Sequence, residues 1–294
     1  MLFRSLALFA YWLVRRKRRG EPTLLDPGLF RHLNFRIGVS QQMLQQITLG
    51  GAMIALPLFL QMTLEYNAMQ AGLSLAPLSL SMFGMALLAG RKVGQHRPAN
   101  IVLVGFALST VGITAIIPLV PRVDSGWYLV IPLLIAGSGL GLLVSQLNNF
   151  TLAPIAEERV SEAAGVNSAA GSFGLSFGLA VAGGLLLWVL AMSFTNLTYS
   201  NDVIPPAQQQ QIAAKMEADA EVMSNTQLQK QIASEPQDVQ NAILAINTEA
   251  RNHSLQVALL VPAIAGLIGF ANAFRMRRLP DIKPAAPLDG ADFG

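Results

Sequence analysis

Long apolar runs recur along the chain, and they restrict its possible folds more than any other feature. The six longest span residues 37–62, 71–90, 100–120, 127–150, 169–194 and 255–274. An α-helix of about 20 apolar residues is long enough to cross the roughly 30 Å hydrocarbon core of a bilayer. The alternating strands of about ten residues that build a transmembrane β-barrel are not seen in the sequence. The runs therefore predict an all-α membrane protein with a bundle of six transmembrane helices.

The composition supports a membrane protein and argues against several functions. Hydrophobic residues make up 52% of the 294 residues and charged residues only 13%, against about 25% charge in a soluble domain. The chain has no cysteine, and its three histidines, His32, His96 and His253, are scattered. We therefore expect no disulfide, no thiol chemistry and no metal site. No nucleophile–base pair stands out, so we expect neither an enzyme nor a bound cofactor. The net charge of +3 comes from basic residues at the ends of apolar runs, which argues against nucleic-acid binding.

A long polar stretch, residues 195–254, separates the fifth apolar run from the sixth. Two segments of it favour a helix. One starts at Pro205–Pro206 and continues with good helix formers, which is typical of a helix start. The other places Val239, Ile243 and Ile246 at helical spacing. We interpret the stretch as a polar helical loop that precedes the last transmembrane helix, 255–274.

Lysines and arginines concentrate on alternate connections between the apolar runs. They cluster at residues 15–19, between 91 and 97, and from 275 onward, whereas residues 62–70 contain none. Cytoplasmic loops are the ones rich in basic residues. The alternation therefore predicts that the linker ending at residue 36 and the tail 275–294 lie in the cytoplasm. The loop 195–254 is then extracytoplasmic.

The chain opens with a short apolar stretch that ends in five consecutive basic residues, Arg15 to Arg19. A signal peptide carries its charge before the apolar core and a small-residue cleavage site after it, and this stretch has the reverse order and no such site. It is also shorter than the roughly 20 residues of a complete spanning helix. We interpret residues 1–36 as the end of a truncated helix followed by a basic cytoplasmic linker. A short amphipathic helix on the membrane surface is the alternative.

Four longer stretches resemble one family in their order and spacing. They read RRKRRGEPTLLDPGLFRHLNFR (15–36), ALPLFLQMTLEYNAMQAGLSLAPLSLSMF (55–83), GSGLGLLVSQLNNFTLAPIAEERVSEAAGVNSAAGSFGLSFGLAVAGG (137–184) and LQVALLVPAIAGLIGFANAFRMRRLPD (255–281). They resemble the linker after the eighth helix and the helices that follow it in the fourteen-helix drug/proton antiporters of the major facilitator superfamily. The resemblance implies the C-terminal half of such a fold, preceded by part of one more helix.

The sequence departs from that family in two places. The family's N-terminal half, which carries the acidic and arginine residues for proton coupling, has no counterpart in these residues. The connection AGRKVGQHRPAN (89–100) resembles the family's cytoplasmic gating loop at Gly90, Arg91, Gly94 and Arg97 but lacks its acidic residue. We expect these four residues to form the corresponding loop, and the missing acid puts its gating role in doubt.

Uncharged polar residues within the apolar runs are the candidates for a substrate cavity, since no acidic or basic residue lies in the middle of any run. Gln42, Gln45 and Gln46 share one helix face at i, i+3 and i+4 spacing. A second cluster, in 127–150, consists of Ser145, Gln146, Asn148 and Asn149. Lipid offers these side chains neither donors nor acceptors. Each cluster is therefore expected either to line a cavity or to bond a neighbouring helix.

Glycines in two of the runs are spaced for close helix packing. Gly137 and Gly141 are four residues apart, and Gly171, Gly174 and Gly178 form a second row. Rows of small residues let two helix backbones approach closely, so we expect these glycines to lie at helix–helix contacts.

The resemblance implies proton-driven export of amphipathic or drug-like small molecules by alternating access. The expected partners are the lipid bilayer, a small-molecule substrate, and a separately encoded N-terminal half or a second copy of the chain. The expected location is the bacterial cytoplasmic membrane. The alternative is a non-transporting remnant or an accessory membrane subunit that lacks the N-terminal bundle. A misplaced start, a split gene and a true loss of the first half remain open at this point.

Overall fold

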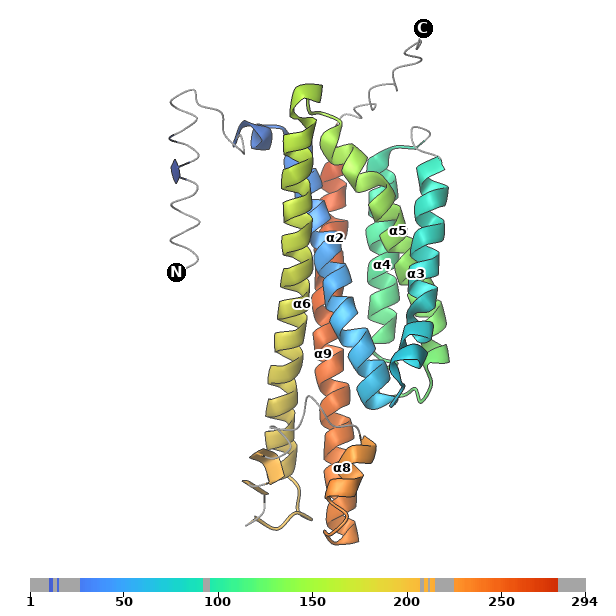
Figure 1. The fold of residues 1–294 in the computed structure, drawn as a ribbon, viewed down its shortest axis with the longest axis vertical. Helices are drawn as coiled ribbons and strands as arrows, with labels where there is room; N and C mark the ends of the chain where they lie inside the picture. The colour runs from blue at the N-terminus through green and yellow to red at the C-terminus, as the bar shows by residue number, and fades with distance from the viewer. Residues whose placement is uncertain are drawn as a thin grey trace.

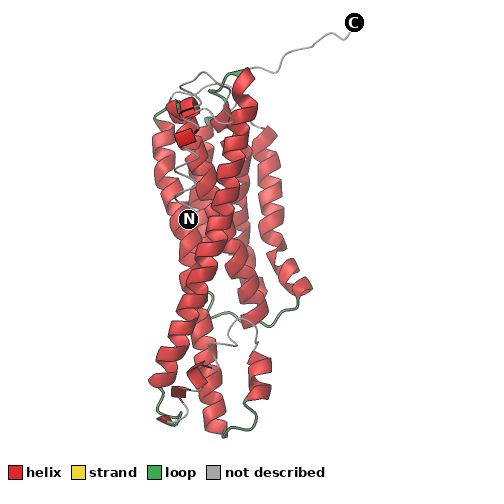
Figure 2. Ribbon diagram, turned by 60° about the vertical axis from the view of Figure 1, so that its left-hand side comes forward, coloured by secondary structure: helices red, strands yellow, loops and turns green. Residues whose placement is uncertain are grey.

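A computed structural model describes residues 27–91, 96–206 and 225–279 of the chain, together with residues 11, 12, 15, 209, 210 and 212–214. All regular structure among these residues is helical, and they contain no strand (Figure 2). The predicted truncated helix and basic linker lie outside the described residues up to position 26, apart from Tyr11, Trp12 and Arg15. The predicted tail lies outside them beyond Leu279.

Six of the described helices are long and apolar enough to cross a membrane. After a short 3-10 turn, η1 (Pro27–Arg31), the order is α2 (Leu33–Leu58), the π-helical turn η2 (Phe59–Thr63), α3 (Ala68–Arg91), α4 (Pro98–Ile116), η3 (Gly126–Leu129), α5 (Val130–Leu152), η4 (Glu157–Arg159), α6 (Val160–Tyr199), α8 (Asn225–Gln231) and α9 (Gln237–Arg277). The prediction of an all-α membrane bundle with six spanning helices is confirmed.

Local sequence accounts for several helix ends. Pro98 occupies the first turn of α4, where its missing N–H and fixed φ cost nothing. The hydroxyl of Ser125 accepts a hydrogen bond from the Trp127 N–H and caps η3. Helix α9 follows Pro236, has Asp238 in its first turn and has arginines in its last, so its charges match the helix dipole at both ends.

Helix α2 occupies the middle of the bundle, while α3 and α6 lie at its two edges (Figure 1). Helix α2 packs against α5, α6 and α9, and α4 packs against α5 and α9. Helix α3 packs chiefly against α5. As a result, only 6% of the apolar 18-residue segment of α3 is buried within the bundle, against 56% of the corresponding segment of α2 and η2. Most of the α3 surface is thus left for lipid or for another protein.

Two helices run past the rest of the bundle at one end (Figure 1). Helices α6 and α9 contain 40 and 41 residues, so each is about 60 Å long, twice the thickness of a bilayer core. The fifth and sixth predicted spans, 169–194 and 255–274, are therefore shorter than the helices that contain them. Residues 237–254 of the stretch that we interpreted as a polar helical loop are the first part of α9. Its periodic apolar residues, Val239, Ile243 and Ile246, are buried in the main core, which explains why the helix continues.

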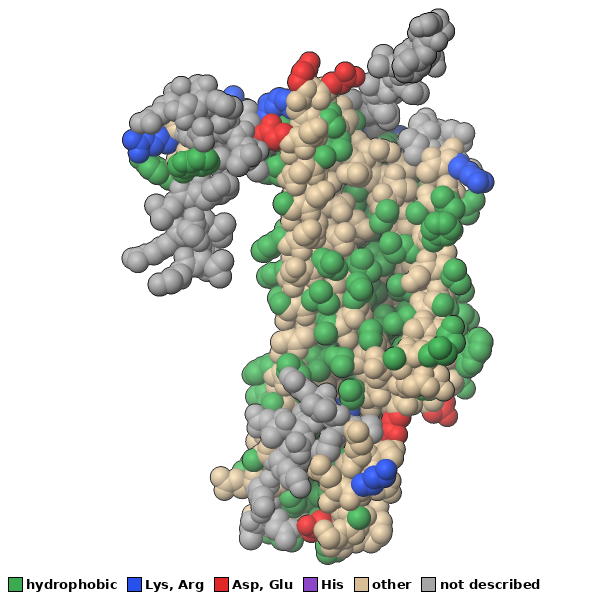
Figure 3. Space-filling view, viewed as in Figure 1, with side chains coloured by type: hydrophobic (Ala, Val, Ile, Leu, Met, Phe, Trp, Pro, Cys, Tyr) green, Lys and Arg blue, Asp and Glu red, His purple; other side chains and the backbone are tan. Residues whose placement is uncertain are grey.

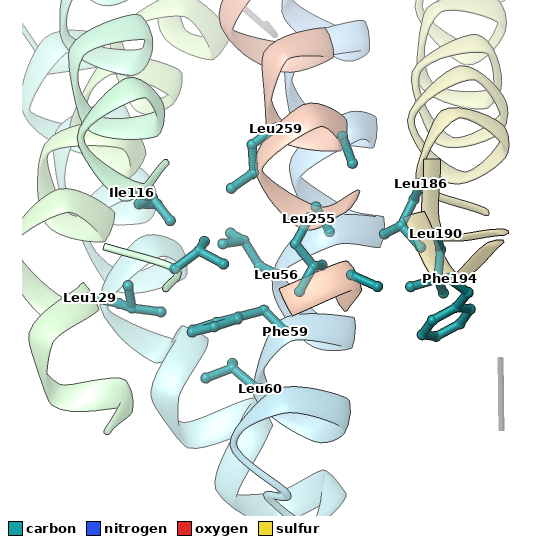
Figure 4. Packing of buried hydrophobic residues seen from close by; sticks show 14 of the residues in the cluster. Leu56, Phe59, Leu60, Ile116, Leu129, Leu186, Leu190, Phe194, Leu255 and Leu259 are labelled. Atoms are coloured by element: carbon teal, nitrogen blue, oxygen red, sulfur yellow. The ribbon is translucent and has the colours of Figure 1, made fainter. Parts of the chain in front are cut away.

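The main hydrophobic core lies where α2 ends, and it extends into the projecting helices. Leu56, Phe59 and Leu60 of α2 and η2 lie in one cluster with Ile116, Leu129, Leu255, Leu259 and the α6 residues Leu186, Leu190 and Phe194 (Figure 4). A second cluster at the other end joins α4, α5 and α9 around Phe106, Leu143 and Ala273. On the visible face, hydrophobic side chains cover the middle and charged ones lie toward the ends (Figure 3), as in a chain that spans a bilayer.

Candidate functional site

The structure separates the three glutamines that we had placed on one face of α2. Gln42 and Gln46 are half-buried against α6, where their side chains lie beside Gly171 and Gly174. Gln45 is 1% exposed and lies inside the bundle. A further glutamine, Gln41, is fully buried and donates from Nε2 to the carbonyl oxygen of Gly269 on α9 over 3.1 Å. The three positions span about 100° around the helix axis, so their side chains meet different neighbours.

Three of these glutamines carry an acceptor that the protein does not use. Among the described residues, the Oε1 atoms of Gln41, Gln45 and Gln46 are buried and have no hydrogen-bond partner. An amide oxygen without a partner in apolar surroundings costs about 1–3 kcal/mol. Three such atoms within two turns of one helix favour a site where water or a ligand donates hydrogen bonds.

The polar residues of α5 fall into two pairs with different surroundings. Ser145 donates to the carbonyl oxygen of Leu142 over 2.8 Å. Gln146 is 1% exposed and donates to the Ser145 hydroxyl over 3.4 Å and to the Ala89 carbonyl over 3.5 Å. Both side chains therefore donate their hydrogen bonds to other groups of the same bundle. Asn148 and Asn149, by contrast, are exposed.

Asn148 of α5 and Asn167 of α6 continue the polar surface of α2 onto two further helices, and Asn149 is the neighbour of Asn148 in the chain. The Asn148 Oδ1 accepts a hydrogen bond from Asn167 Nδ2 of α6 over 3.0 Å. Asn148 lies one turn before Thr151, which contacts Gly38 of α2, and Asn167 lies one turn before Gly171, which faces Gln42. The amides of α2, α5 and α6 are therefore at the same level of the bundle. We call them the amide cluster; its members are Gln42, Gln46, Asn148, Asn149 and Asn167.

Only part of the expected gating loop can be described. Gly90 and Arg91 are the last residues of α3, and both are exposed. Arg97 precedes α4 and donates from its guanidinium to the carbonyl oxygen of Leu279 over 3.3 Å, which connects this loop to the end of α9. Gly94 lies outside the described residues.

The glycines that we expected at helix contacts lie between helices. A Cβ added at Gly174 or Gly178 would lie 2.5 Å from the carbonyl oxygen of Met43 or Ile47 on α2. Gly137 and Gly141 face the carbonyl oxygens of Leu78 and Met82 on α3 in the same way. A further glycine of α5, Gly139, approaches the backbone of α4, and the sequence reasoning had not selected it.

A buried arginine at the opposite end of the bundle was also missed, because the sequence reasoning assigned it to a polar loop. Arg251 of α9 is 5% exposed. Its guanidinium donates to Asn247 Oδ1 over 3.1 Å and to the Met62 carbonyl oxygen of η2 over 3.3 Å. The nearby Glu65, which has a left-handed φ of 54°, accepts a bond of 2.8 Å from the Thr226 N–H. The available signal was a lone arginine four residues before an apolar run.

Comparisons with known proteins agree with the helical architecture. The sequence matches the family described as Major Facilitator Superfamily over residues 3–179, more than half of the chain. It is 26% identical over 185 residues to a protein of Streptomyces coelicolor named as a probable actinorhodin transporter, covering 62% of this chain and 32% of that protein. It is 25% identical over 215 residues to the multidrug resistance protein Stp of Mycobacterium tuberculosis, covering 73% of this chain and 38% of Stp.

The chain thus spans about a third of the length of the curated relatives that it matches. It is an integral membrane protein with several spanning helices, and the family assignment confirms the prediction that it is not an enzyme. The helices, their order and the sequence match lead to one conclusion: the chain belongs to the Major Facilitator Superfamily.

Proposed function

We propose that this chain forms the C-terminal helical bundle of a transporter that exports amphipathic or drug-like small molecules. Transporters of this kind work by alternating access, in which two bundles rock around a site near the middle of the membrane. Family membership supports transport. The names of the relatives, which refer to actinorhodin and to multidrug resistance, support an amphipathic organic substrate. The bacterial cytoplasmic membrane is the proposed location.

The amide cluster is the observation that carries this proposal. Asn148 and Asn149 are exposed, and Gln42 and Gln46 are half-buried, on helices that cross the membrane. Side-chain amides facing hydrocarbon would leave strong donors and acceptors without partners. The cluster is therefore suited to a water-filled cavity, where the amides could bind polar groups of a substrate. Its position across α2, α5 and α6 favours this surface as the one that faces a second bundle.

A second bundle is part of the proposal. It is either a separately encoded N-terminal half or another copy of this chain. Proton coupling is also proposed, and its acidic residue is expected on the partner bundle, because none of the six apolar runs contains an acidic residue in this sequence and ionisable groups within a membrane usually mark ion routes. The match covers only 32% of the probable actinorhodin transporter. The alternative function is therefore that of a non-transporting remnant or an accessory membrane subunit.

The orientation of the bundle can be tested by labelling single cysteines, since the chain has none of its own. Lys230 of α8 and Arg278 after α9 are both exposed, at opposite ends of α9. We expect a cysteine at position 230 to react with a membrane-impermeant maleimide on intact cells. A cysteine at position 278 is expected to react only after permeabilisation. The reverse pattern would contradict the proposed topology. Reaction of both sites on intact cells would contradict a crossing of the membrane by α9 between them.

The role of the amide cluster can be tested in the assembled transporter with Asn149→Leu. Asn149 is exposed, so the substitution should leave the packing of α5 intact. We expect efflux of some substrates to fall about fivefold, as expected for one lost hydrogen bond of about 1 kcal/mol. The abundance of the protein should stay unchanged. The readout is efflux of a panel of fluorescent amphipathic cations and neutral dyes, normalised to protein amount.

Asn100→Leu is the matched control for this measurement. Asn100 is an exposed amide on α4, which contributes no residue to the amide cluster, so the same chemical change should leave the substrate profile intact. Equal changes in both variants, or a loss of abundance with an unchanged profile in Asn149→Leu, would contradict a substrate-contacting role.

A further inference from the structure

A cavity of about 250 Å³ lies at the end of the bundle where α2 finishes. It is lined by residues of α2, η2, α6 and α9. We call it the η2 cavity. Its lining includes Leu58, Met62, Thr63, Gly183, Leu187 and Arg251.

The cavity exists because α2 and α6 are in contact along one part of their length and diverge along the next. At Gly50 and Gly178, an added Cβ would lie 2.5 Å from a carbonyl oxygen of the other helix. At Gly183, the nearest atom of α2, on Ile54, would be 3.6 Å away. Beyond this point Pro57 lies within α2, and the helix continues as the π-helical turn η2. Proline and π-helical turns both redirect a helix, and such turns are frequent at functional sites.

The walls and the end of the cavity differ in chemistry. The walls are apolar and include Leu58, Met62 and Leu187. Two polar residues, Thr63 and Arg251, are also in the lining. The Thr63 Oγ1 is buried and has no hydrogen-bond partner in the described part of the chain. The Arg251 guanidinium is fixed by Asn247 and by the Met62 carbonyl oxygen. The polar groups are thus hydrogen-bond donors held beside an apolar space.

The η2 cavity is separate from the amide cluster. Gln42 and Leu58 lie sixteen positions apart on α2, which corresponds to about 24 Å along the helix. The two sites therefore lie at different depths along α2. A ligand in the cavity would not need the second bundle that the proposed transport requires.

We propose that the η2 cavity binds a small amphipathic molecule with an apolar body and a hydrogen-bond acceptor, such as a carboxylate or an ester, at one end. At roughly 30 Å³ for each water-sized group, the space holds about eight non-hydrogen atoms. The apolar part lies against the leucines and Met62, and the acceptor lies at Thr63 and Arg251. Two sources share this chemistry: a short-chain organic acid from solution, and the ester end of a lipid acyl chain that enters from the bilayer.

Photo-crosslinking of the purified full chain tests this site. The first probe is hexanoate carrying a diazirine on its tail, and the second is phosphatidylcholine carrying a diazirine next to its ester. We expect adducts on Leu58, Met62 or Leu187 with at least one probe, mapped by mass spectrometry. Competition by unlabelled hexanoate identifies a soluble acid as the source. Labelling by the lipid probe alone identifies an acyl chain.

Two substitutions give matched comparisons. Gly183→Leu places a side chain in the cavity and is expected to lower adduct yield at least about tenfold, because a closely packed interior has no room for both. Gly184→Leu makes the same change one residue away, where an added Cβ meets nothing within 4 Å, and should leave labelling unchanged. Thr63→Val keeps the shape and removes the hydroxyl. It should weaken hexanoate labelling about fivefold without affecting a purely alkyl diazirine of equal length.

Three results would overturn the proposal. The first is the absence of cavity adducts with both probes in folded protein. The second is equal labelling of the Gly183→Leu and Gly184→Leu variants. The third is an equal effect of Thr63→Val on the acidic and the alkyl probe, because an acceptor would then not be recognised. Folding of every variant is checked by size-exclusion chromatography before labelling.

Discussion

Replacing Gly178 by leucine is expected to prevent the bundle from folding. A Cβ at this position would lie 2.5 Å from the carbonyl oxygen of Ile47 and 2.9 Å from its Cα. These are backbone atoms of α2, the central helix, so no rotamer change relieves the clash. Separating α2 from α6 would also expose buried residues along the contact. Overpacking of a core usually costs about 1–3 kcal/mol, and a clash with backbone places this variant at about 4 kcal/mol or more.

The measurement is the yield of monodisperse protein by size-exclusion chromatography, together with its melting temperature in detergent. Gly184→Leu is the control, since it lies on the same helix and an added Cβ there meets nothing within 4 Å. We expect normal yield for Gly184→Leu and almost none for Gly178→Leu, with Gly178→Ala between them. A Gly178→Leu protein as stable as the control would show that α2 and α6 are not in backbone contact.

The sequence was sufficient to predict the helices but not where two of them end. An apolar run reports only the part of a helix that is in contact with hydrocarbon or core. Outside the apolar runs, α9 exposes polar residues such as Asn241, Thr248 and Glu249, so a hydropathy pattern does not detect these turns. The spacing of Val239, Ile243 and Ile246 did indicate a helix. Its continuity with the last span follows from packing against Leu228 and Ile204, which are contacts that no local pattern specifies.

The candidate site was predictable in residue type but only partly in geometry. An amide in an apolar run is costly enough to attract notice on its own, which is why Gln46 and Asn148 could be selected. Which neighbour each side chain meets depends on its angular position around the helix axis. Gln42 lies on the side of α2 that faces α6, whereas Gln45 faces the interior of the bundle. Arg251 was missed because its burial depends on the Met62 carbonyl oxygen of η2, far away in the sequence.

Expressed alone, the chain is expected to show no proton-driven efflux. Alternating access requires two bundles that move about a shared site, and this chain provides the helices of one. No acidic or basic residue lies within its six apolar runs, so a proton carrier at mid-membrane is absent from that part of the sequence. In proteoliposomes with an imposed pH gradient, the efflux rate should equal that of protein-free vesicles.

Adding the N-terminal bundle of a matched relative, such as Stp, is the positive arm of the same experiment. Efflux that appears only when both bundles are present would support a split transporter, and its sensitivity to Asn149→Leu would place the substrate near the amide cluster. Efflux from neither arm would favour the accessory or remnant function.

Gradient-dependent efflux by this chain alone would contradict the half-transporter proposal and require two copies to act as the two bundles. Glu65 would then become the proton-site candidate, although its carboxylate already accepts a hydrogen bond from the Thr226 N–H. In such a homodimer, Glu65→Gln should abolish the dependence of efflux on the pH gradient.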